Sequence, residues 1–173
     1  MNVTIRQEQE KDFKQVYHVI FSAFEKEEYS DHTEQDLVVK LRTSDAFIPQ
    51  LSLVAEVDGT VVGHILFTKL TVGNEQVLAL APLSVLPSMQ RQGIGSALIK
   101  EGHRIGRELG FKGSIVLGHP HYYKKFGYEN ASKYKIECPF PVEDDIFMAK
   151  ELVPNGLNNV KGMAIYAKEF NLL

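Results

Sequence analysis

The sequence predicts a fold that mixes helices and strands, α/β in the broad sense and α+β in the narrower one. One mixed sheet of six or seven strands has helices on both faces. Two turn signals, Asp58-Gly59 and Gly73-Asn74, separate apolar runs before residue 85 and predict an antiparallel meander. A helical pattern then leads to the apolar run Ser114 to Leu117, which is typical of a buried parallel strand. Antiparallel strands followed by one parallel crossover make the sheet mixed.

Length and composition predict one domain over residues 1–173. A chain of 173 residues with 44% hydrophobic side chains can bury a sizeable core. The net charge of -3 gives no electrostatic reason to bind nucleic acid or an anionic membrane, so we expect small-molecule or protein partners. Its single cysteine, Cys138, cannot form an internal disulfide, and the chain shows neither a signal-peptide pattern nor a stretch of transmembrane length. We therefore expect a cytoplasmic protein.

The N-terminal part reads as a short strand followed by two helices. Residues 3–6 alternate apolar and polar side chains, as a half-buried strand does. A helical apolar stripe follows, made of Phe13, Val16, Tyr17, Ile20, Phe21 and Phe24. This stripe predicts that the helix turns its four aromatic rings toward the core. Thr33 is placed to cap a second helix, with Leu37, Val38 and Leu41 on its apolar side.

Pro82 interrupts the third strand of the meander. Proline cannot donate to a sheet ladder, so it marks a bulge or a place where strand pairing lapses. Such a break leaves backbone donors and acceptors of Leu83 to Val85 free to bind a ligand.

The next stretch has the features of an anion site. A helix begins at Gly93-Ile94-Gly95 and ends at Gly110, and the first N–H groups of a helix have no intrahelical acceptor. Glycines let a bulky anion approach those amides, while Arg91 and Gln92 add a cation and donors. A nucleotide P-loop is excluded because no Lys-Ser or Lys-Thr follows, and the dinucleotide fingerprint fails because Leu98 stands where it needs a glycine or alanine.

The run Gln90-Arg91-Gln92-Gly93-Ile94-Gly95 resembles the Q/R-x-x-G-x-G/A motif of the GCN5-related N-acetyltransferase (GNAT) superfamily, and Leu83 to Pro87 resembles its fourth strand. The resemblance implies the acyl-CoA N-acyltransferase fold, with a splayed central strand pair that holds the pantetheine arm. It implies acetyl-CoA as co-substrate and no metal. The implied cofactor-binding residues are Leu83, Ser84, Val85, Gln90, Arg91, Gln92, Gly93, Ile94, Gly95 and Ser96.

A second stretch, residues 118–128, resembles the family's F-Y-x-x-x-G-F segment. Tyr122 stands in the place of the first Phe, Tyr123 in the place of the Tyr and Tyr128 in the place of the last Phe. The match implies that Tyr123 is the catalytic proton donor to the departing thiolate; the alternative is that it packs over the sulfur and the pantetheine without transferring a proton. Tyr122 is assigned to the core. This segment and the last strand look most like a poorly characterised bacterial branch of predicted N-acetyltransferases. His119 and His121 lack further ligands at a suitable spacing, so we expect no metal site.

The resemblance implies an N-acetyltransferase that moves the acetyl group of acetyl-CoA directly to a primary amine. The acceptor, a small molecule or a protein amine, is not identified by the sequence. Two alternatives stay open: a non-catalytic acyl-CoA sensor or interaction module on the same fold, and a purely structural domain. A general base also stays open among Glu25, Glu28, Glu56, His64 and solvent.

The acceptor side and the oligomeric state are less constrained. In the family, the first two helices and their link line the acceptor pocket, so the acidic cluster Glu25, Glu27 and Glu28 is a candidate site for a cationic amine. The predicted last strand, Met163 to Ala167, could pair at an exposed edge. Both a monomer and a homodimer are therefore compatible with the sequence.

Overall fold

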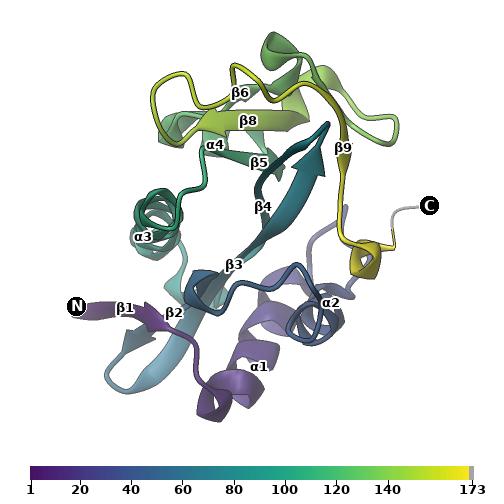
Figure 1. The fold of residues 1–173 in the computed structure, drawn as a ribbon. Coiled ribbons are helices and arrows are strands. Elements are labelled where there is room, and N and C mark those ends of the chain that lie inside the picture. The colour runs from purple at the N-terminus through teal and green to yellow at the C-terminus, as the bar shows by residue number, and fades with distance from the viewer. Residues whose placement is uncertain (172–173) are drawn as a thin grey trace.

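A computed structural model describes residues 1–171 of the chain (Figure 1). Its α-helices are α1 (Phe13–Phe24), α2 (Glu34–Leu41), α3 (Ile94–Glu108) and α4 (Pro120–Tyr123). Its strands are β1 (Val3–Gln7), β2 (Ser52–Val57), β3 (Thr60–Val72), β4 (Glu75–Val85), β5 (Gly113–Leu117), β6 (Glu129–Asn130), β7 (Ile136–Glu137), β8 (Phe147–Glu151) and β9 (Gly162–Ile165). Within this described part, no helix has both the length and the apolar character needed to cross a bilayer.

The strands form one mixed sheet. Its main path has the order β1-β2-β3-β4-β5-β8-β6, and β9 pairs with both β3 and β7. Adjacent strands are antiparallel except for β4–β5 and β7–β9. The predicted mixed sheet is confirmed along the main path, and the short strands β7 and β9 raise the total to nine. The expected exposed last strand is wrong, because β9 has a neighbour on each side.

Helices cover both faces of the sheet, as predicted (Figure 1). Successive strand residues point to opposite faces, so Leu53 and Ile65 lie on one side and Val54 and Leu66 on the other. The first pair packs in the core that contains Ile94, Leu98 and Ile99 of α3. The second pair packs in the core formed with α1 and α2. A ligand bound beside α3 and one bound beside α2 would thus approach the sheet from opposite faces.

Helix α1 forms where the apolar period predicts it, but a different sector of the helix faces the sheet. Val16, Val19 and Ile20 are buried, whereas Phe13, Tyr17 and Phe21 are 37%, 41% and 45% exposed. The branched aliphatic side chains pack closely on the pleated sheet, and the rings of Phe13 and Tyr17 lie beside polar partners instead. The Arg42 guanidinium stacks 3.9 Å from the centre of the Phe13 ring, and the Tyr17 hydroxyl donates to Asp36 at 3.0 Å. The prediction that all four rings face the core is therefore wrong.

The break at Pro82 is present and separates β4 from β5. The β3–β4 register shifts there, since Phe67 pairs with Leu80 but Ile65 pairs with Leu83. Pairing between β4 and β5 covers only residues 78–80 with 114–116, so residues 83–85 are paired with β3 alone. The predicted bulge and the splayed central pair are confirmed.

Candidate active site

The loop before α3 presents the first amides of that helix. Gly93 is the N-cap residue with φ 85°, a left-handed conformation that glycine adopts without strain. A Cβ at this position would meet nothing within 4 Å, so the backbone conformation and not space requires the glycine. At position 95 it is space that requires a glycine, because a Cβ there would lie 2.5 Å from the hydroxyl oxygen of Tyr122. Gly93 therefore allows the backbone to turn into the helix, and Gly95 leaves room for the Tyr122 hydroxyl against the first turn.

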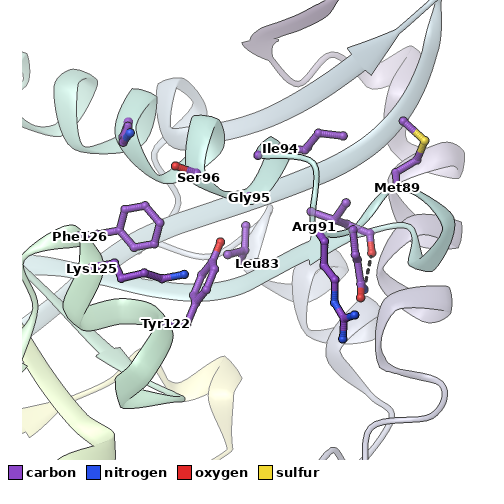
Figure 2. Close-up of a pocket in the computed structure, with 13 residues that line it drawn as sticks. Leu83, Met89, Arg91, Ile94, Gly95, Ser96, Tyr122, Lys125 and Phe126 are labelled. Carbon is purple, nitrogen blue, oxygen red and sulfur yellow. Dashed lines mark hydrogen bonds between the residues drawn. The ribbon is translucent and has the colours of Figure 1, made fainter. Parts of the chain in front are cut away.

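A cavity of about 730 Å³ lies between the start of α3 and the turn that contains α4 (Figure 2). Tyr122 points from α4 toward Gly95 and Ser96, with Lys125 and Phe126 beside it. The residues that line the cavity are Leu83, Val85, Met89, Gln90, Arg91, Gly93, Ile94, Gly95, Ser96, Lys100, Tyr122, Lys125 and Phe126. The cavity therefore combines free helix amides, the unpaired end of β4 and an aromatic wall.

Most of the predicted cofactor-binding residues come together here. Leu83, Val85, Gln90, Arg91, Gly93, Ile94, Gly95 and Ser96 all line this cavity. Ser84 does not, since it is buried and pairs with His64, and Gln92 is exposed with its side chain donating to the Ser88 carbonyl at 3.4 Å.

Sequence reasoning missed five lining residues. They are Met89, Lys100, Tyr122, Lys125 and Phe126. Lys100 follows Ser96 by four positions, and this helical spacing places the two on one face and could have identified it. The other four depend on how the loop and α4 pack against α3, which no local pattern specifies.

Arginine and lysine give the cavity a positive charge. Arg91, Lys100 and Lys125 line it, and no carboxylate does. Within residues 1–171, none of these three cations forms an ion pair with a carboxylate. Phosphate groups suit such a site because free helix amides and unpaired cations both stabilise negative charge.

Beyond the bulge, β4 has backbone groups that no strand satisfies on its β5 side. Residues 83–85 pair with β3 only, while β5 has diverged. The Gln90 side-chain amide donates to the Val85 carbonyl at 3.1 Å and ties the loop to the strand end. An extended ligand arm in the gap could take the place of the missing strand, because it would satisfy these groups.

Tyr122 and Tyr123 occupy different positions around the cavity. Tyr122 lines it, so its assignment to the core alone is wrong. Tyr123, the predicted proton donor, lines neither cavity; its ring makes edge-to-face contacts with the rings of Tyr122 and Tyr128, at centroid distances of 5.1 and 5.9 Å. Burial raises the pKa of Tyr123 well above its usual range, so the phenol is protonated at neutral pH. In the described part of the chain, no side chain or carbonyl accepts a hydrogen bond from this hydroxyl.

A second cavity, of about 1030 Å³, lies on the α2 side of the sheet. It meets the sheet at Leu80 and Ala81, immediately before the bulge, and at Leu117, the last residue of β5. Its carboxylates are Asp31, Glu34, Asp36 and Glu169, and Lys40 is its one lining cation among the described residues. Aromatic walls come from Tyr29, Phe140, Tyr166 and Phe170. The two cavities thus reach β4 at neighbouring residues from opposite faces.

The sequence-derived candidates for a general base lie outside both cavities. Glu25, Glu28, Glu56 and His64 are absent from the residues that line either one. Glu56 accepts from Arg6 at 3.1 Å, and His64 is fully buried with its Nε2 3.0 Å from the Ser52 hydroxyl. Burial lowers the pKa of His64 to about 4, although the nearby Glu8 raises it. Within the described residues, no group of three His, Cys, Asp or Glu side chains could hold a metal ion.

Comparisons with known proteins agree with the geometry of this site. Residues 10–128 match the model of the acetyltransferase (GNAT) family. Two uncharacterized N-acetyltransferases of Escherichia coli K12 are similar in sequence. YjhQ is 35% identical over 75% of this chain and 81% of its own, and YhbS is 34% identical over 83% and 86%.

Solved structures give the same result. The crystal structure of E. coli YhbS in complex with CoA has a TM-score of 0.90 at 30% identity and covers 99% of this chain and 93% of its own. A GNAT acetyltransferase from Brucella melitensis in complex with acetyl-CoA has a TM-score of 0.82 at 33% identity, with 98% of both chains covered. On these matches to family, sequence and structure, the chain belongs to the acetyltransferase (GNAT) family.

Proposed function

We propose that residues 1–173 act as one N-acetyltransferase domain that transfers the acetyl group of acetyl-CoA directly to a primary amine. The observation that carries this proposal is the pair of cavities that reach β4 from opposite faces at the splayed gap. One cavity has free amides and cations suited to phosphates, and the other has carboxylates suited to an amine, which is positively charged before it reacts. Acetyl-CoA supplies the thioester whose acetyl group is transferred.

The chain's own groups would do three things in this reaction. Backbone amides of residues 91–96 hold the diphosphate of the co-substrate at the α3 N-terminus. Unpaired N–H groups of residues 83–85 stabilise the oxyanion that develops on the thioester carbonyl, a contact typically worth ~2.7–4 kcal/mol when one donor is deleted. Tyr123, protonated and free of other hydrogen bonds, donates its proton to the departing thiolate.

The two neighbouring tyrosines give a matched test of the proton donor. Tyr123→Phe keeps the ring but removes the proposed donor, so the affinity for acetyl-CoA should hold while turnover falls by about 10²-fold, the lower end of the usual range for a general acid. The lower end is expected because burial, by raising the pKa of Tyr123, makes it a weaker acid. Tyr122→Phe, the control, removes a hydroxyl that lines the cavity and should change affinity more than turnover.

The measurement is CoA release from acetyl-CoA in the presence of a library of primary amines, together with acetyl-CoA binding by calorimetry. An amine that stimulates release supports the proposal. Tight acetyl-CoA binding without amine-dependent release would instead favour the alternative function, a non-catalytic acyl-CoA sensor. A Tyr123→Phe variant with wild-type turnover, when chemistry limits the rate, would leave this residue as a wall of the site.

We also propose a cellular compartment for the reaction and an oligomeric state for the protein. We propose that the reaction takes place in the cytosol, because the single cysteine, Cys138, forms no disulfide and acetyl-CoA, the co-substrate, is an intracellular metabolite. Both cavities are built from one chain, so a monomer suffices for the reaction, and a homodimer would leave the mechanism unchanged. The acceptor can be a small molecule or a protein amine.

A further inference from the structure

The first cavity carries more positive charge than a diphosphate requires. Arg91, Lys100 and Lys125 line it together with the free amides of α3, and no carboxylate lines it. CoA has a diphosphate and, one ribose away, a 3′-phosphate monoester. Such a monoester carries about 1.5 to 2 negative charges at neutral pH and three strong acceptor oxygens. A second group of cations is the chemical feature that would recognise it.

Position separates Arg91 from the two lysines. Arg91 lies in the loop before α3, whereas Lys100 lies on α3 itself, four residues after Ser96 and therefore on the same helix face. Figure 2 shows Arg91 on one side of Gly95 and Lys125 on the other. The amides and Arg91 can hold one phosphate group while the lysines are available for another.

Lys125 is oriented into the cavity by an aromatic ring. Its Nζ lies 4.9 Å from the centre of the Tyr122 ring, and the hydroxyl of that ring lies against the start of α3. A cation over a ring face is held electrostatically but keeps its hydrogens free to donate. Lys125 therefore faces α3, the helix that carries Lys100, from the other side of the cavity.

The ion pairs of α3 leave Lys100 free. Glu101, the carboxylate next to it in sequence, accepts two hydrogen bonds from Arg104, at 2.6 and 3.0 Å. Glu108 pairs with the same arginine at 2.7 Å. Both of these carboxylates are thus engaged by Arg104, which does not line the cavity, and Lys100, which does, keeps its charge for a ligand.

We propose that Lys100 and Lys125 form a phosphate subsite that binds the 3′-phosphate of CoA and so selects CoA over its 3′-dephospho form. The inference rests on the proposed function, because it takes this cavity as the place where acetyl-CoA binds. It adds a specificity determinant that the glycine loop does not provide, since backbone amides hold a diphosphate in either form.

The test compares the binding of CoA and of 3′-dephospho-CoA by calorimetry. The double variant Lys100→Gln/Lys125→Gln should bind CoA about tenfold more weakly, as expected for the loss of two exposed charge-assisted contacts. The same double variant should weaken 3′-dephospho-CoA by less than about twofold, because the group that these lysines contact is absent from it. Lys124→Gln is the matched control: it removes an adjacent exposed lysine that lines neither cavity, and it should leave both affinities unchanged.

Two results would overturn the inference and leave the proposed function intact. One is a wild-type protein that binds both ligands equally well. The other is a double variant that weakens both by the same factor, which would mean that the lysines act only through the general charge of the cavity. A wild-type protein that binds neither ligand would contradict the proposed function itself, so the two failures are distinguishable.

Discussion

Two histidines in the interior are neutral at neutral pH, and burial is the main cause for each. It lowers the pKa of His64 to about 4 and that of His103 to about 3. Glu8 opposes the shift at His64 and Arg42 adds to it, while Lys150 and Arg107 add to it at His103. Each ring still has a polar partner, since His64 contacts Ser52 at 3.0 Å and His103 contacts the Tyr128 hydroxyl at 2.9 Å. Both therefore act as structural groups that acid should disrupt.

Stability should fall as the pH drops below about 6.5, the ordinary pKa of an unfolded histidine. Between that value and the lowered folded-state pKa, the unfolded chain binds more protons, so each histidine destabilises the fold by about 1.4 kcal/mol per pH unit. Urea unfolding at pH 7, 6 and 5 measures this slope. His64→Asn should reduce this slope by about 1.4 kcal/mol per pH unit, because it removes one of the two buried histidines. Equal slopes in the wild-type protein and in His64→Asn would contradict this interpretation.

At the scale of elements, the site depends on how closely α4 approaches the first turn of α3. The hydroxyl of Tyr122 occupies the space that a side chain at position 95 would need. Gly95→Ala should therefore displace the Tyr122 ring and weaken acetyl-CoA binding. Adding Tyr122→Phe removes the clashing atom, and the next ring atom, the carbon that bears this hydroxyl, is 3.8 Å from the added Cβ, an ordinary contact.

A double-mutant cycle measures this coupling. Calorimetric affinities for acetyl-CoA of the two single variants and the double variant should be non-additive, with the double variant binding better than Gly95→Ala alone. Additive losses would mean that the methyl group blocks the ligand directly and that Tyr122 plays no part. Thermal unfolding of each variant without ligand checks that the fold is retained.

The same elements show what a sequence can predict. The limits of α3 follow from local chemistry: the Gly93 N-cap and the Gly110 stop, where Phe111 N–H bonds to the Gly106 carbonyl at 3.0 Å. The side of α1 that is buried does not follow from local chemistry. The apolar period marks a broad face of this helix, and packing against β3 decides which part of that face is buried. Tyr122 and Tyr123 differ by one position in a single helical turn, so only the placement of α3 determines which one lines the cavity.

At the scale of the molecule, the proposed reaction depends on a sheet that opens in its middle. Pro82 and the register shift could be foreseen because they are local, and they explain why β4 leaves β5. The second cavity could not be foreseen, since it is assembled from α2, the middle of β4, the end of β5 and the segment around residues 166–171. No pattern within one segment contains that information.

The most direct measurement is a crystal structure of the protein with acetyl-CoA. We predict the diphosphate on the amides of residues 91–96, the pantetheine arm between β4 and β5, and the thioester carbonyl within hydrogen-bond distance of an N–H group of residues 83–85. The sulfur should lie within reach of the Tyr123 hydroxyl, and the acetyl group should face the second cavity. A diphosphate bound away from the α3 N-terminus, or an acetyl group that points away from the cavity beside Leu80 and Leu117, would contradict the proposed mechanism.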